Sequence, residues 1–113
     1  MFAEYNYDEF PYVKVKFNKT IENSEDFDKF LAGWIELYNQ KQKFIFIFDT
    51  TNVGFVNPIY CFKMAMFIHN LKQREIQYLQ KSYIIVSSEI VEKLLELIFF
   101  LQKPVAPVHL IKN

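Results

Sequence analysis

Apolar residues follow two spacings along this chain, one typical of strands and one typical of helices. Residues 43–48 contain five consecutive apolar side chains, which predicts a strand buried on both faces, as in a parallel sheet. Residues 12–17 alternate instead, with Val13, Val15 and Phe17 on one face and lysines on the other. That alternation predicts a strand with one solvent-facing side, close to a sheet edge.

Weaker patterns predict three further strands. Residues 2–7 alternate loosely, and residues 83–86 form a short apolar run. Residues 105–111 predict a closing strand, which Pro107 assigns to a sheet edge because proline cannot donate a ladder hydrogen bond.

Helical spacing accounts for the segments between these strands. Asn23 or Ser24 is expected to cap a helix that ends near Gln40. A second helix is predicted over residues 58–72, with Asn57-Pro58 as N-cap and first helical residue. A third, capped by Ser88, is predicted from residue 89 to about residue 102, before Pro104.

The order of these elements, β(β)αβαβαβ, predicts the fold class. Strands that alternate with helices imply a largely parallel sheet with right-handed crossovers. We therefore expect one α/β domain over residues 1–113. It should have a mixed, largely parallel sheet of four or five strands and three main helices. Residues 43–48 should be central and residues 105–111 nearer an edge.

A polar turn follows the predicted central strand, at the edge where open α/β sheets place their sites. This turn supplies the candidate site residues Asp49, Thr50, Thr51, Asn52 and Asn57. Asp49 could act as a general base or phosphoacceptor, or it could cap the loop. We expect the capping role, with Asp49 accepting hydrogen bonds from loop backbone N–H groups.

The second helix is apolar nearly all round, whereas a surface helix usually shows one apolar stripe. Either a phenylalanine-rich core encloses it fully, or part of it forms an interface. The interface interpretation predicts a homo-oligomer or a protein partner. Its candidate residues are Ile59, Tyr60, Met64, Phe67, Leu71, Leu97 and Phe100.

Composition narrows the function classes. The 13 basic and 13 acidic side chains give a formal net charge of zero, which argues against nucleic-acid binding. Cys61 is the one cysteine, so no intrachain disulfide can form, and we expect a reducing, cytoplasmic location. The first residues lack the features of a signal peptide, and no apolar stretch predicts a transmembrane segment.

Motifs for catalysis and cofactor binding are missing. Gly33 and Gly54 are the only glycines, so neither a P-loop nor a dinucleotide fingerprint can be present. His69 and His109 lack neighbouring ligands at metal-binding spacing. We therefore expect no metal, no cofactor and no enzymatic activity, a buried inert Cys61, and a core role for Trp34 rather than a ligand platform.

Residues 44–56, FIFIFDTTNVGFV, resemble a pattern of STAS domains, which share the SpoIIAA-like fold with CRAL-TRIO lipid-binding domains. In that pattern an apolar strand, an Asp and a short turn precede an Asp-Ser helix start. Asp49 matches the strand-end Asp, whereas Asn57-Pro58 stands where the family has Asp and its phosphorylatable Ser. Residues 82–104 also resemble the closing strand and helix of CRAL-TRIO domains, without the long lid of those proteins.

Two functions are implied by this resemblance. The first is a non-catalytic, STAS-like interaction or regulatory module that associates with itself. The alternative is a small CRAL-TRIO-like domain that binds a lipid or another apolar ligand. A cavity lined by Phe and Met would favour the second function, and a flat apolar patch paired across a two-fold axis would favour the first.

Overall fold

The computed structural model describes residues 2–18 and 20–113 and contains five strands and three helices. In chain order these are β1 (Ala3–Glu9), β2 (Tyr12–Phe17), α1 (Ser24–Asn39), β3 (Phe44–Asp49), α2 (Ile59–Leu71), β4 (Leu79–Val86), α3 (Glu89–Leu101) and β5 (Val108–Lys112). The predicted bounds of β2 are reproduced, and the other elements differ at their ends. The largest difference is in β4, which begins at Leu79 rather than at Tyr83.

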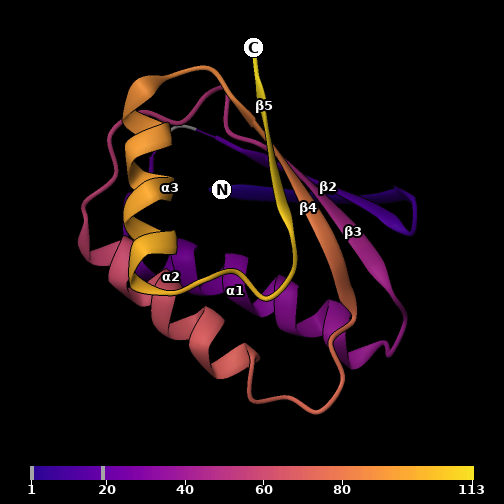
Figure 1. Ribbon diagram of the computed structural model, residues 1–113. Coiled ribbons are helices and arrows are strands. Elements are labelled where there is room, and N and C mark those ends of the chain that lie inside the picture. Colours follow the sequence, from indigo (N-terminus) through magenta and orange to yellow (C-terminus); the bar gives the residue numbers. More distant parts are fainter. Residues whose placement is uncertain (1, 19) are drawn as a thin grey trace.

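The strands form a single mixed sheet in the order β1-β2-β3-β4-β5 (Figure 1). The β1–β2 pair is antiparallel, and the other three pairs are parallel. The predicted fold class is therefore confirmed, including the central position of β3 and the edge position of β5.

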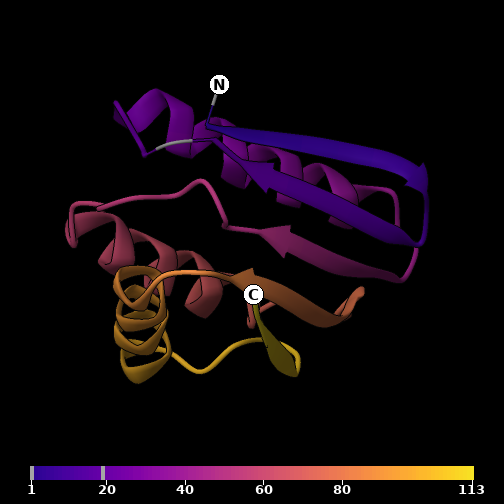
Figure 2. The same cartoon turned by 90° about the horizontal axis from the view of Figure 1, so that it is seen from above.

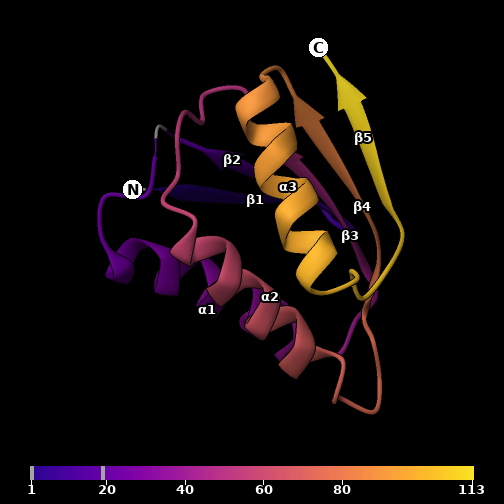
Figure 3. The ribbon, with the colours of Figure 1, turned by 60° about the vertical axis from the view of Figure 1, so that its left-hand side comes forward.

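All three helices lie on one side of this sheet (Figures 1 and 3). Right-handed crossovers that always step to the next strand in the same direction place every helix on the same face. The opposite face is left without helices, so Ile45 and Ile47 of β3 are only partly buried. The prediction that β3 is buried on both faces is thus wrong. Helices would cover the second face only if some crossovers ran in the opposite direction along the sheet.

The core lies between the sheet and the helices. Phe44, Phe46 and Phe48 of β3 point to the helix side, with ring centroids 5.0 and 4.5 Å apart in succession. Trp34 of α1 packs edge-on against Phe46 at 4.9 Å. Trp34 is therefore a core residue, as the sequence predicts. Figure 2 shows α1 running beside the β1–β2 end of the sheet, whereas α2 and α3 lie toward the β4–β5 end.

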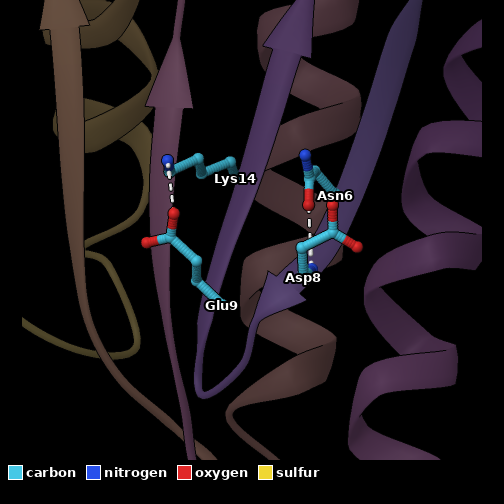
Figure 4. A network of polar contacts seen from close by, with 4 residues as sticks. All are labelled: Asn6, Asp8, Glu9 and Lys14. Atoms are coloured by element: carbon cyan, nitrogen blue, oxygen red, sulfur yellow. Dashed lines mark hydrogen bonds and ion pairs between the residues drawn. The ribbon is translucent and has the colours of Figure 1, made fainter.

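Local polar contacts shape the β1–β2 hairpin (Figure 4). The Asp8 N–H donates to Asn6 Oδ1 at 2.8 Å, and Lys14 Nζ lies 3.3 Å from Glu9 Oε1. The peptide bond Phe10–Pro11 is cis. The Lys14–Glu9 pair is exposed and is worth at most about 1 kcal/mol, so its role is to set local geometry.

Gly33 allows β1 and α1 to approach closely. A Cβ atom built on Gly33 would lie 2.6 Å from the Tyr5 ring, which is closer than real contacts allow. The Tyr5 hydroxyl donates to the Phe30 carbonyl of the same helix at 2.5 Å, which holds the ring in place. Burial raises the pKa of the Tyr5 phenol. A side chain at position 33 would therefore require the Tyr5 ring to shift.

We predict that Gly33→Ala lowers the free energy of unfolding by about 1 to 3 kcal/mol, because the added methyl group must displace the Tyr5 ring. Urea titration followed by circular dichroism would measure the change. Gly54→Ala is the matched control, since a Cβ at Gly54 meets nothing within 4 Å. In a Tyr5→Ala background, Gly33→Ala should cost much less, and equal costs in both backgrounds would contradict the clash.

Candidate functional site

The turn after β3 is organised around Asp49. The Thr51 N–H donates to Asp49 Oδ1 at 2.9 Å, and the Thr51 hydroxyl donates to the same oxygen. These two bonds from Thr51 are the main reason that the pKa of Asp49 lies below its usual value. Asp49 therefore accepts a backbone hydrogen bond within its own loop, as expected for a loop-capping residue.

The other polar residues near this turn form separate local hydrogen bonds or are exposed. Thr50 is buried, and both its N–H and its hydroxyl donate to the Ile85 carbonyl, at 3.1 and 2.6 Å. Asn52 is exposed. Asn57 Oδ1 accepts from the Ile59 N–H at 3.0 Å. Helix α2 begins at Ile59, one residue later than expected, because Pro58 occupies the N-cap position and Asn57 supplies the capping oxygen.

The candidate interface residues are not on one surface. Leu71 is buried, and Tyr60, Met64 and Phe67 are half-buried against the core. The Tyr60 ring packs on Phe27, and the Phe67 ring packs on Trp34. This side of α2 faces inward because the α1 aromatic residues cover it.

The opposite side of α2 carries the exposed apolar surface. Phe62 and Met66 are 50% and 67% exposed, and Ile59 lies on the same side. On α3, Phe100 is 86% exposed, whereas Leu97 is half-buried. The exposed apolar residues available for an interface on these helices also include Ile90 and Leu101 of α3.

An apolar cavity of about 170 Å³ lies between the sheet and the helices. Its deep wall is formed by buried side chains of α1 and the central strands, among them Trp34, Phe48 and Ile84. Its shallow wall is half-buried and comes from the inner face of α3, the segment 104–106 and the start of β5. The cavity therefore reaches from the centre of the core to the α3–β5 margin.

The cavity exists because α3 packs less deeply than α1. Five residues of α1 are buried, whereas Val91 alone is buried in α3. Small side chains add to the space, since Ser82 of β4 and Ala106 both line the cavity. Ser82 sits opposite Phe46 in the β3–β4 register. The large Phe46 ring on β3 thus packs against α1, whereas the neighbouring position on β4 holds only the small Ser82 side chain.

Chemically, the wall of the cavity is almost entirely apolar, and none of the described residues that line it carries a charge. Thr50 and Ser82 are its buried polar residues. Cys61 also lines it, and burial raises the pKa of the thiol, which favours its protonated form. The described lining is thus suited to enclosing an apolar molecule.

Sequence reasoning missed the cavity residues Ser82 and Ala106 and assigned Trp34 to the core alone. One signal was available, because Ser82 is a polar residue on the otherwise apolar, helix-facing side of β4. The volume of the cavity depends on the distance between α3 and the sheet, and the spacing of residues along the sequence does not predict that distance.

Residues 2–18 and 20–113 hold no group of three His, Cys, Asp or Glu residues that could bind a metal ion. His69 is exposed, and His109 stacks on Tyr83 on the helix-free face of the sheet. No helix among the described residues has the length and apolar character needed to cross a membrane.

Comparison with known proteins adds no family assignment. No protein-family model, no curated protein and no solved structure matches the chain. The geometry of the site is therefore the basis for assigning a function.

We predict that Asp49→Ala lowers the free energy of unfolding by about 1 kcal/mol at pH 7, because the loop loses two hydrogen bonds to a partly exposed carboxylate. A lowered folded-state pKa stabilises the fold above the unfolded pKa, near 3.8, and this contribution is lost as pH falls through the folded value. The difference between wild type and variant should therefore shrink between pH 5 and about pH 3.

Urea titrations at a series of pH values would measure this difference. Glu75→Ala is a suitable control, since it removes an exposed carboxylate elsewhere on the surface. A difference that stays constant down to pH 3 would contradict the electrostatic part of the argument. Unchanged unfolding midpoints would contradict the capping role and return Asp49 to the candidates for a direct functional role.

Proposed function

We propose that this protein is a non-catalytic binding module that encloses one small apolar molecule in the cavity beneath α3. The observation that carries the proposal is the size and lining of that cavity, about 170 Å³ of almost wholly apolar space. An engineered apolar cavity of about 150 Å³ in another protein stays dry and binds benzene. A ligand of one aromatic ring or a short alkyl chain therefore matches the space.

The depth of the cavity also supports this proposal, because one wall is formed by buried core side chains. A ligand that fills the space makes apolar contacts with these side chains, which are favourable in proportion to the apolar area removed from water.

This proposal corresponds to the apolar-ligand alternative derived from the sequence. A cavity lined by Phe and Met residues was the feature expected to favour it, and Phe30, Phe48 and Met64 all line the space. The order of the elements in the structure also supports the resemblance to the SpoIIAA-like fold. That resemblance remains part of the proposal.

We predict that Ala106→Leu fills the mouth of the cavity, raises the free energy of unfolding by about 0.5 to 2 kcal/mol and weakens ligand binding. Benzene, added to saturation, should raise the melting temperature of the wild type, since a ligand of the native state stabilises it by mass action. The same addition should have little effect on Ala106→Leu.

Ala32→Leu is the matched control, because it makes the same change at an exposed position of α1. This control should respond to benzene as the wild type does. A wild type whose melting temperature does not change with benzene, xenon or short alkanes would overturn the proposal.

A second candidate function is self-association as a STAS-like interaction module. The observation that favours it is the exposed apolar surface of α2 and α3, formed by Ile59, Phe62, Met66 and Phe100. Monomers rarely expose large contiguous apolar patches. A homodimer would cover these residues, since two-fold self-pairing is the commonest oligomer and needs about 800 Å² per partner.

We predict that Phe62→Glu and Met66→Glu convert a dimer into a folded monomer, because both outward-facing side chains would bring charge into the interface. Size-exclusion chromatography with light scattering would measure the mass. Lys63→Glu is the control, since Lys63 is an exposed charged neighbour in the same turn. A wild type that stays monomeric at high micromolar concentration would exclude this second function.

A further inference from the structure

Among the residues that line the cavity, Trp34 and Ser82 carry buried polar groups and are 5% and 4% exposed. Trp34 Nε1 is buried and is the one side-chain nitrogen or oxygen of this kind without a hydrogen-bond partner in the described part of the chain. An unpartnered buried N–H is costly to stability, so such groups are rare in folded proteins.

Both groups lie beside the same side chain, Phe46. The Trp34 and Phe46 ring centroids are 4.9 Å apart, and Ser82 is the register partner of Phe46 on the neighbouring parallel strand. Adjacent strands are separated by about 4.8 Å. The indole and the hydroxyl therefore flank the same phenylalanine, and Ser82 also lies beside Val108 at the start of β5.

Thr50, the third polar residue that lines the cavity, already has a hydrogen-bond partner for its hydroxyl. The Thr50 hydroxyl donates to the Ile85 carbonyl at 2.6 Å. Trp34 Nε1 is a donor only, whereas a serine hydroxyl can donate or accept. The deep wall thus offers hydrogen-bond donors, and within residues 2–18 and 20–113 no Lys, Arg or His lines the cavity.

We infer that the cavity selects uncharged ligands that carry a carbonyl oxygen, and that Trp34 Nε1 donates to this oxygen while the apolar remainder of the ligand extends toward α3. This inference rests on the proposed function. A hydrocarbon fills the same volume but leaves the indole N–H without a partner. A carboxylate is rejected, since it would be desolvated in an apolar wall with no cation to pair with it.

The test uses three probes of nearly equal size, namely acetophenone, ethylbenzene and benzoate. Trp34 is the only tryptophan, so its indole N–H gives a single, unambiguous ¹H–¹⁵N resonance. Acetophenone should shift this proton downfield, ethylbenzene should perturb it without a downfield shift, and benzoate should not bind. In Trp34→Phe, acetophenone affinity should fall about tenfold and ethylbenzene affinity should change little.

Ser82→Ala is the matched variant, because it removes the neighbouring hydroxyl and leaves the indole in place. It should keep the downfield shift and most of the acetophenone affinity. If Ser82→Ala loses the preference for acetophenone and Trp34→Phe keeps it, the assignment of Trp34 as the donor is wrong.

The remaining outcomes separate this inference from the proposed function. If acetophenone and ethylbenzene both bind but shift the indole proton alike, as for an N–H directed at a neighbouring ring, the inference fails and the binding function stands. If neither probe binds, the proposed function fails and this inference fails with it. The indole shift is measured on the wild type, so the test does not depend on the stability of Trp34→Phe.

Discussion

The packing of this protein depends on the column of phenyl rings along the helix-facing side of β3. Successive rings of Phe44, Phe46 and Phe48 lie 5.0 and 4.5 Å apart, and Trp34 of α1 meets Phe46 edge-on. Such aromatic pairs contribute about 0.5 to 1.5 kcal/mol each beyond the area they bury. The column occupies the middle of the sheet, so it fixes α1 closely and sets the depth of the core there.

The cavity lies where this aromatic packing ends, on the β4 and β5 side of the sheet. Beyond β3 the helix-facing side chains become smaller, with Ser82 and Ile84 on β4 and Val108 on β5. Helix α3 has no comparable rings beneath it, and only Val91 becomes fully buried. One half of the layer is therefore tightly packed and the other half contains space. A chain of 113 residues has little stability to spare for such space.

The one-sided sheet explains the excess of apolar surface. Hydrophobic residues make up 51% of the chain, but a two-layer structure encloses only one face of its sheet. Ile45 and Ile47 remain partly open on the far face, while Phe62, Met66 and Phe100 remain open on the outer side of the helices. These surfaces and the cavity are separate consequences of the same two-layer arrangement.

The sequence alone determined the features that depend on neighbours in the chain. Alternation in residues 12–17 predicted the bounds of β2, and Asn23 and Ser88 cap α1 and α3 through their own side chains. The capping bonds of Asp49 and Asn57 were likewise predictable, because each joins residues two positions apart. Strand and helix order, with the rule of right-handed crossovers, then predicted the fold class.

Only the tertiary structure decided the features that require a choice between equivalent surfaces. Both sides of α2 are apolar, so the sequence pattern does not distinguish the side of Tyr60 and Phe67 from the side of Phe62. In the structure Tyr60 and Phe67 face inward because they pack on Phe27 and Trp34 of α1, and Phe62 faces outward. Both faces of β3 are apolar as well, and the common direction of the crossovers selected the buried one. The cavity was set by the distance between α3 and the sheet, because packing volume is a sum over residues far apart in the chain.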